Sequence, residues 1–301
     1  MKIFIPGGLG FVGTHLCRAL LQNGHEVTAV GRRPNPGNMI DHPSFSYLAA
    51  DTTKPGEWQR RLADQEVVVN LTGKSIFTLW TEKARKEIYD SRILTTRNLA
   101  ESLAGRSDAI FLSTSAIGYY GDRGDDVLGE DQPPGSDFLA TVSRDWEREA
   151  MSAAAGGNRV ALLRFGIVLH RHGGAMASMI PAFKLFLGGR LGSGRQWFPW
   201  IHLDDLVAAS LFVIDHPELS GPLNFCAPQP VRNTELTSAL AKKLNRPVML
   251  PTPSWVMTTL LGQFGQTLLN SQRGKPAALL ESGFSFTYKT LDTALAEIIK
   301  A

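Results

Sequence analysis

The stretch Ile3-Phe4-Ile5-Pro6-Gly7-Gly8-Leu9-Gly10-Phe11-Val12-Gly13 decides the fold, because it predicts a buried strand, a glycine turn and the first turn of a helix. Gly7 permits the tight turn, Gly10 lets the backbone come close to a pyrophosphate, and Gly13 lets the helix lie close to the strand. The unpaired N–H groups at the start of such a helix, together with its dipole, bind anions. The stretch therefore predicts a seat for the pyrophosphate of a dinucleotide.

An ordinary tight turn between a strand and a helix also explains three glycines, so the flanking sequence matters. Residues 12–20 carry apolar side chains at helical spacing, and Gly24 stands where a helix C-cap belongs. A second apolar strand, Glu26 to Val30, closes a strand-helix-strand unit of about thirty residues. The candidate contacts to the cofactor in this unit are Gly7, Gly8, Gly10, Phe11, Val12 and Gly13.

The residues at the end of the second strand indicate which dinucleotide binds. An acid there hydrogen-bonds the ribose 2′-hydroxyl of NAD, whereas an arginine accommodates the 2′-phosphate of NADP. This chain has Gly31-Arg32-Arg33 and no carboxylate, which favours NADP (NADPH) as the cofactor. The alternative is that both arginines are solvated surface charges.

The composition is that of an ordinary globular enzyme, with 301 residues of which 43% are hydrophobic and 20% charged. The net charge of +3 is dispersed along the chain, which argues against a nucleic-acid partner. Cys17 and Cys226 form no metal or redox spacing, and we expect them to be buried thiols in a reducing compartment. Without a signal peptide or an apolar run of about eighteen residues, we expect a cytoplasmic protein that does not contact a membrane.

Two later strands end in residues suited to a ligand crevice. Glu66 to Gly73 is a β-branched run typical of a central parallel strand, and its end would place Leu71, Thr72 and Gly73 near the nicotinamide ribose. The run from Ala109 to Ser115 changes from apolar to hydroxyl residues, so Ser115 is a candidate to hydrogen-bond a substrate oxygen. A simple Ser/Thr turn is the alternative.

Three further groups have two interpretations each. Glu87 and Arg92, in a predicted helix from Thr81 to Leu103, either point to solvent or face the cofactor. Arg195, among glycines 188 to 194, either holds an anionic substrate group or belongs to a flexible surface loop. His202 precedes a helix for which Asp204 or Asp205 is the predicted cap, and we expect the histidine to be a structural hydrogen-bonding residue.

The alternation of strands and helices predicts an α/β fold, a doubly wound parallel sheet of the Rossmann type with a small C-terminal substrate lobe. We expect a discontinuous NADP-binding domain of residues 1–169 and 201–228. Residues 170–200 and 229–301 would then form the smaller lobe. The sequence shows no internal repeat.

With these motifs in place, the chain resembles the extended short-chain dehydrogenases/reductases, and within them the YfcH-like epimerase-family group of atypical members (the NAD(P)-dependent epimerase/dehydratase family). The matching runs span nearly the whole length: 7–13, 31–32, 69–73, 91–92, 118–121, 138–139, 146–147, 164–169, 188–194, 200–205, 222–224 and 282–284. The resemblance implies NADP(H) at the glycine turn and at Gly31-Arg32. It also implies cofactor contacts from Leu71-Thr72, Glu87, Arg92 and the backbone around Val168, and a C-terminal lobe of uncharacterised role from Pro251 onward.

The resemblance fails at the usual catalytic pair. The superfamily moves the substrate proton with a Tyr and a Lys four residues later, because a free tyrosine has a pKa near 10 and needs the neighbouring cation. None of the five tyrosines of this chain has Lys at that spacing. The positions where the pair belongs read Phe138 and Val142, and neither side chain can move a proton.

Two functions remain open from the sequence. In the first, the protein is an NADP-dependent oxidoreductase or nucleoside-diphosphate-sugar epimerase, with Ser115 and Tyr119 or Tyr120 in catalysis and Arg195 on an anionic small-molecule substrate. In the second, it is an NADPH-binding sensor or scaffold without turnover. The sequence allows a monomer or a homodimer.

Overall fold

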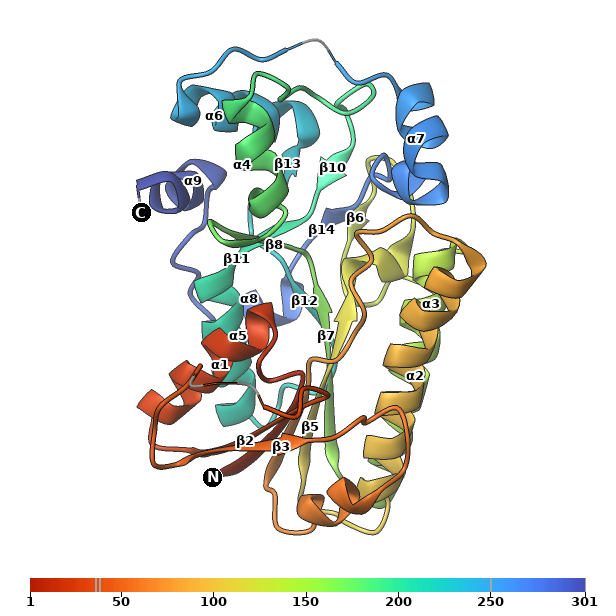
Figure 1. Ribbon diagram of the computed structural model, residues 1–301, viewed down its shortest axis with the longest axis vertical. Helices are drawn as coiled ribbons and strands as arrows, with labels where there is room; N and C mark the ends of the chain where they lie inside the picture. Colours follow the sequence, from red (N-terminus) through yellow and green to blue (C-terminus); the bar gives the residue numbers. More distant parts are fainter. Residues whose placement is uncertain (36, 38, 250, 301) are drawn as a thin grey trace.

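The computed structural model describes residues 1–35, 37, 39–249 and 251–300. Its centre is a seven-stranded sheet in which every neighbouring pair is parallel (Figure 1). From edge to edge the strands are β12 (Gly221–Phe225), β7 (Arg159–Phe165), β5 (Ile110–Ala116), β4 (Val67–Asn70), β1 (Lys2–Pro6), β2 (Glu26–Gly31) and β3 (Phe45–Ala49). The doubly wound parallel sheet predicted from the sequence is confirmed.

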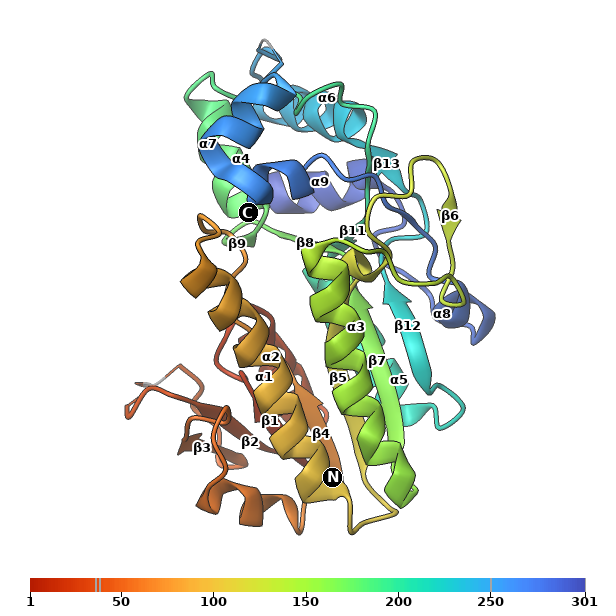
Figure 2. The same ribbon diagram turned by 90° about the vertical axis from the view of Figure 1, so that its right-hand side faces the viewer.

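Helices cover both faces of this sheet, α1 (Phe11–Gln22) and α5 (Leu203–Asp215) on one face and α2 (Glu82–Leu103) and α3 (Phe138–Met151) on the other (Figures 1 and 2). The alternation of side chains along a strand divides the core accordingly. Ile3 and Ile5 of β1 join the cluster that contains α1 and α5, whereas Phe4 joins the cluster of α2 and α3. The short helices η1 (Glu57–Leu62) and η3 (Ser152–Gly156) extend the second cluster.

The order of the strands creates one topological switch point. β1 lies between β2 and β4, so the connections after β1 and after β4 leave in opposite directions across the sheet. Parallel strands all end at the same edge, and ligands of such sheets bind where the order reverses. The glycine turn after Pro6 and the loop after Asn70 lie together at this point, with Leu71 N donating to Pro6 O over 2.9 Å.

The remaining elements form small sheets and a helical group at the other end of the molecule (Figure 1). The short strands and the 3-10 turn are η2 (Ile117–Tyr120), β6 (Val127–Leu128), β8 (Ile167–His170), β9 (Gly173–Gly174), β10 (Trp197–Phe198), β11 (Trp200–His202), β13 (Val231–Arg232) and β14 (Arg273–Gly274). The helices are α4 (Met176–Lys184), α6 (Asn233–Leu244), α7 (Ser254–Thr267), α8 (Ala277–Glu281) and α9 (Leu291–Lys300). Helices α4, α6 and α9 share a third apolar cluster.

Residues 159–170 form two strands that belong to different sheets. Strand β7 ends at Phe165, and β8 belongs to a separate three-stranded sheet with β9 and β11. The break is at Gly166, where a Cβ atom would lie 2.5 Å from the carbonyl oxygen of Pro199. The close approach of this crossing segment therefore requires glycine. We propose the division into 1–169 with 201–228, and 170–200 with 229–301, because α4 of the first inserted segment packs with α6 and α9 of the second in one apolar cluster.

Two helix caps differ from those predicted. His202, not an aspartate, caps α5, with its Nδ1 accepting from the backbone N–H of Asp204 over 3.2 Å. The structural role expected for His202 is confirmed. Asp205 instead accepts hydrogen bonds from the backbone of Thr287 and Tyr288 at 2.7 and 2.9 Å. The N-cap position of α6 is Arg232, one residue before the predicted Asn233.

Asp205→Ala should destabilise the protein, because it leaves two backbone N–H groups of the C-terminal segment without their acceptor. Asp205 is only 1% exposed, so water replaces the carboxylate poorly. We expect a loss of about 2 to 4 kcal/mol in the free energy of unfolding. Thermal and urea unfolding measure it. The matched control is Asp204→Ala, an exposed neighbour, and an equal loss in both variants would contradict the assigned role.

Candidate functional site

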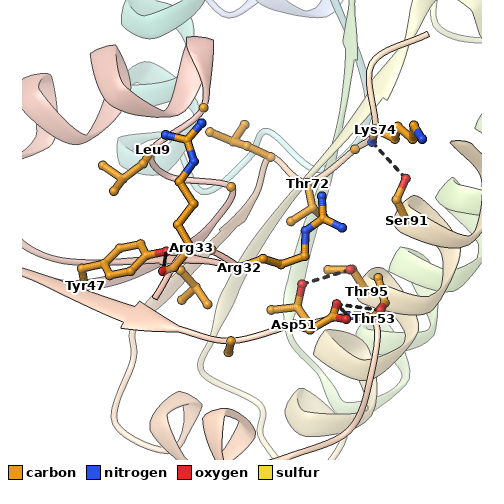
Figure 3. A pocket seen from close by; sticks show the side chains of 18 of the residues that line it. Leu9, Arg32, Arg33, Tyr47, Asp51, Thr53, Thr72, Lys74, Ser91 and Thr95 are labelled. Atoms are coloured by element: carbon orange, nitrogen blue, oxygen red, sulfur yellow. Dashed lines mark hydrogen bonds between the residues drawn. The ribbon is translucent and has the colours of Figure 1, made fainter. Parts of the chain in front are cut away.

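A cavity of about 320 Å³ opens at the switch point of the sheet (Figure 3). Its lining comes from the glycine turn, the end of β2, the end of β3 and the loop after β4, with one side of α2. The lining residues are Gly7, Leu9, Gly10, Val30, Gly31, Arg32, Arg33, Met39, Tyr47, Ala50, Asp51, Thr52, Thr53, Leu71, Thr72, Gly73, Lys74, Ser91 and Thr95. Of the predicted cofactor residues, eight line this cavity: Gly7, Gly10, Gly31, Arg32, Arg33, Leu71, Thr72 and Gly73.

The glycines of the first turn have different roles. Gly7 has φ of +80°, and a Cβ there would lie 2.7 Å from the carbonyl oxygen of Leu71. A Cβ on Gly13 would lie 2.4 Å from the oxygen of Gly7, so these two positions allow close approach of backbone. A Cβ on Gly10 would have one close neighbour, the carbonyl oxygen of Gly7 at 3.1 Å. Gly10 is the N-cap of α1 and lines the cavity. The first N–H groups of α1 have no side-chain cap.

Arg32 and Arg33 bring positive charge to the cavity. Both are exposed, and within the described part of the chain neither guanidinium has a carboxylate within 4.0 Å. Figure 3 shows their side chains directed apart, Arg33 toward Leu9 and Arg32 toward Thr72. The nearby Asp51 accepts hydrogen bonds from Thr53, which together with the charge of Arg32 lower its pKa. The cavity therefore offers uncompensated cations to an anion.

The loop after β4 is held by side chains behind it. Asn70, fully buried, accepts from the N–H of Thr72 at 3.1 Å and from its hydroxyl at 2.5 Å. Its amide nitrogen donates to Thr96 of α2 over 2.8 Å. Ser91 accepts from the N–H of Lys74 at 3.0 Å. Asn70 ends an apolar run in the sequence, and that abrupt change to an amide is the signal by which it could have been found.

Glu87 and Arg92 lie behind the loop rather than in the cavity lining. The Arg92 guanidinium donates to the carbonyl oxygens of Lys74 and Ile88 at 3.0 and 2.9 Å, and burial lowers its pKa to about 10. A Cβ on Gly73 would lie 3.0 Å from this guanidinium. Glu87 forms an ion pair with Lys74 at the surface. In this structure both residues contact the protein's own loop.

Four more predicted cofactor residues lie outside the lining. Gly8 and Gly13 form the packed part of the turn, and Phe11 and Val12 begin α1. The ring of Phe11 lies 5.8 Å from that of His170, measured between centroids. The remaining one, Val168, pairs with Ile201 between β8 and β11.

The structure does not support catalytic roles for Ser115 and Tyr120. Ser115 is 1% exposed, and its hydroxyl donates to Glu147 over 2.6 Å. Tyr120 is fully buried, accepts from Arg164 and donates to Asn224, each over 2.8 Å. Burial raises the pKa of Tyr120 to about 12. Both hydroxyls belong to a buried network around the Glu147–Arg164 ion pair, which the sequence did not reveal.

Two other hydroxyls near the end of β5 are not engaged in that network. Tyr119 is half-buried with the Arg164 guanidinium carbon 3.7 Å from its ring centroid, and its hydroxyl forms no hydrogen bond with any described residue. Thr114, which the sequence analysis did not select, points to the opposite face of the sheet from Ser115. Its Oγ1 is buried without a hydrogen-bond partner among the described residues. Neither Tyr119 nor Thr114 lines the cavity at the switch point.

Arg195 does not line the cavity at the switch point. Its side chain is exposed, and its carbonyl oxygen accepts a hydrogen bond from Arg232. The structure therefore agrees with the surface-loop alternative and not with a substrate clasp. The described residues contain no group of three or more His, Cys, Asp or Glu side chains arranged to hold a metal ion. Among the helices described, none is long and apolar enough to cross a membrane.

Comparison with known proteins identifies the family of this fold and site. The model of the NAD dependent epimerase/dehydratase family matches residues 3–225. The chain belongs to this family. A second model, a domain of unknown function (DUF1731), matches residues 252–298. The resemblance found in the sequence is thus confirmed.

Individual relatives cover the whole chain. The chloroplastic epimerase family protein SDR39U1 homolog of Arabidopsis thaliana is 37% identical over an alignment of 304 positions. The alignment covers 100% of this chain and 87% of that protein. The crystal structure of human epimerase family protein SDR39U1 with NADPH has a TM-score of 0.86 and 31% identity, covering 100% of this chain and 99% of that one. The nucleoside-diphosphate sugar epimerase of Corynebacterium glutamicum has a TM-score of 0.78 and 34% identity, covering 99% of this chain and 58% of that one.

Proposed function

We propose that this protein of the epimerase/dehydratase family binds NADP(H) and transfers hydride to or from a small-molecule substrate. The observation that carries the proposal is the cavity at the amino end of α1, which combines uncapped helix N–H groups with the unpaired Arg32 and Arg33. Such a site suits a diphosphate next to a further phosphate. The human relative SDR39U1 is solved with NADPH, which agrees with this choice of cofactor.

The chain's own residues fit the parts of NADP(H). The open side of Gly10 and the start of α1 would hold the diphosphate, and Arg32 and Arg33 would hold the 2′-phosphate. The loop from Leu71 to Gly73, fixed from behind by Asn70 and Arg92, would support the middle of the dinucleotide. The bound cofactor would supply the hydride, and the protein would supply position and charge.

Within this function the proton must move through a residue other than the missing Tyr-Lys pair. Tyr119 carries this proposal, because its hydroxyl is free of partners within the described residues and it lies against the Arg164 cation. The Corynebacterium relative is named a nucleoside-diphosphate sugar epimerase, so epimerisation is one form that this chemistry could take.

The lack of an available proton-transfer group at the expected positions favours the alternative, an NADPH-binding sensor or scaffold without turnover. The usual proton-transfer positions are Phe138 and Val142, and the hydroxyls of Ser115 and Tyr120 are engaged in a buried network. A protein that only senses NADPH needs the cofactor cavity and no acid or base. The two functions differ in whether bound NADPH changes its redox state when candidate metabolites are added, which the absorbance of the reduced nicotinamide reports. Turnover that Tyr119→Phe leaves unchanged would remove Tyr119 from the mechanism.

Arg32→Ala should weaken NADPH and leave NADH nearly unchanged. Loss of a charge-assisted hydrogen bond to a phosphate costs about 1.5 to 3 kcal/mol, which corresponds to roughly a tenfold to hundredfold rise in Kd. Calorimetric titration of both nucleotides measures this. Arg60→Ala, which removes an exposed arginine away from the cavity, is the matched control. Equal affinities of the wild type for NADPH and NADH would contradict the proposed role of Arg32.

The substrate of this proposal is a small molecule, and nucleic acid or membrane partners are not part of it. We propose that the protein acts in the cytoplasm, where its two buried cysteines stay free thiols, as a monomer or a homodimer.

A further inference from the structure

A second cavity, of about 700 Å³, shares no lining residue with the first. Its walls come from three segments far apart in the sequence: the start of α2, the two ends of the loop between η2 and α3, and the end of α7. The lining residues are Trp80, Arg85, Tyr120, Gly121, Asp122, Arg123, Pro134, Gly135, Ser136, Asp137, Phe138, Gln263, Gln266, Thr267 and Asn270. Figures 1 and 2 show α7 lying beyond the amino ends of α2 and α3, and the C-terminal segment supplies one wall of the cavity.

Aromatic side chains join α7 to the Rossmann part of the chain beside this cavity. Trp80 contacts Phe138 edge-on, with ring centroids 5.1 Å apart, and lies 5.7 Å from Phe264 of α7. Phe77 adds a second contact to Phe264, also at 5.7 Å. Trp80 and Phe138 themselves line the cavity and give it one apolar wall. Phe138 is also one of the two positions at which the sequence analysis expected the superfamily's Tyr-Lys pair.

Two arginines and two aspartates line the cavity, and one of the arginines, Arg123, pairs with Asp126. The guanidinium carbon of Arg85 lies 4.4 Å from the ring centroid of Phe138, and no carboxylate among the described residues lies within 4.0 Å of it. Of the two acids in the lining, Asp137 has both carboxylate oxygens engaged and Asp122 has one. Asp137 accepts from the N–H of Ala140 and from the amide of Asn270, each over 2.9 Å, and Asp122 accepts from the N–H of Ser271 over 3.0 Å.

The amide wall opposite is also available to a ligand. Gln263 and Gln266 are exposed on α7, and their side-chain amides form no hydrogen bond with any described residue. An amide supplies two donors and one acceptor, and an arginine supplies a planar fork of donors that matches carboxylate or phosphate. The cavity thus combines one arginine without an ion-pair partner among the described residues, Arg85, with an apolar wall and polar amides, which is the usual make-up of a small-molecule site.

We infer that this cavity binds a small organic anion, a carboxylate or a phosphate, that presents its charged group to Arg85 and an apolar face to Trp80 and Phe138. If the cavity is the substrate site of a hydride-transferring enzyme, the inference rests on the proposed function. Binding of the anion itself does not depend on that function, because the two cavities share no residue. The C-terminal segment has a role in it, since α7 supplies the amide wall.

The test uses phenyl phosphate as the probe, because it joins an aromatic ring to a phosphate. Calorimetric titration of the full chain, with and without saturating NADPH, should show one bound phenyl phosphate, while the neutral benzyl alcohol should not bind. Benzoate in place of phenyl phosphate distinguishes a preference for carboxylate from one for phosphate. Arg85→Gln should weaken the preferred anion at least tenfold, and Arg85→Lys should retain part of the affinity.

The matched control is Lys83→Gln, which removes an exposed cation from the same turn of α2 outside the lining. It should leave the affinity for the probe unchanged, and Arg85→Gln should leave the melting temperature and NADPH affinity unchanged. Absence of binding by either anion to the wild type, or binding that Arg85→Gln does not weaken, would overturn the inference. Loss of NADPH binding with Arg85-dependent binding of phenyl phosphate retained would refute the proposed function alone.

Discussion

Gly10→Asp should abolish measurable NADPH binding while the protein stays folded. Gly10 is the N-cap of α1 with φ of −78° and ψ of −176°, an extended conformation that aspartate adopts without strain. Aspartate is among the best N-cap residues, so the melting temperature should hold or rise. Its carboxylate would accept from the same helix N–H groups that the diphosphate needs and would repel its charge. We expect a Kd at least roughly a hundredfold higher, about 3 kcal/mol or more.

Gly10→Asn separates the charge from the shape of this substitution. Asparagine also caps the helix and occupies the same volume, but it carries no charge. We expect it to weaken NADPH less than Gly10→Asp does, with the difference reduced by added salt. Titration of both variants and of the wild type gives the comparison. Wild-type affinity in Gly10→Asp would mean that the diphosphate is not held at this helix end.

Glu147→Leu should cause the largest loss of stability of any variant proposed here. Arg164 donates to the two oxygens of Glu147 over 2.8 Å, and both side chains are buried. Although burial opposes it, the Glu147 carboxylate and Tyr120 keep the pKa of Arg164 above its usual value. Removing the carboxylate leaves a buried cation without its counter-charge, which costs about 3 to 5 kcal/mol. Urea unfolding of the variant and the wild type measures the difference.

The double variant Glu147→Leu with Arg164→Met tests whether the cost comes from the uncompensated charge. Replacing both partners by apolar residues removes the charge, so part of the lost stability should return. The recovery will be incomplete, because Arg164 also donates to Tyr120 and to the carbonyl oxygen of Glu130. If the double variant has a lower free energy of unfolding than Glu147→Leu, the uncompensated charge of Arg164 is not the origin of the effect.

The sequence predicted the parallel sheet and the first cavity because both depend on local signals. Each of these signals determines the structure of backbone only a few residues away. They are the glycines of the turn, the apolar runs of β1, β4 and β5, and the arginines after β2. The long helix α2 was also predicted correctly, and Thr81 accepts from the N–H of Ala84 as its cap. The place of Gly31-Arg32-Arg33 in the cavity lining follows from one rule, that the residues at the end of the second strand contact the ribose of the dinucleotide.

The buried network could not be predicted, since its members are brought together only by the fold. Ser115, Glu147 and Arg164 lie on β5, α3 and β7, and nothing in their spacing shows that they meet. The Ser115 hydroxyl at a strand end therefore resembled a catalytic group, although it donates a hydrogen bond to the buried Glu147 carboxylate. The second cavity was missed for the same reason, because α7 is more than a hundred residues from the other walls in sequence. The side chains of Thr114 and Ser115 lie on opposite faces of β5.

The most direct test of the account is a crystal structure of this protein grown with NADPH. The account predicts a diphosphate at the amino end of α1 against Gly10, with the 2′-phosphate in contact with Arg32 or Arg33. NADPH bound elsewhere, or a cavity at the end of β1 that stays empty at saturating NADPH, would contradict it.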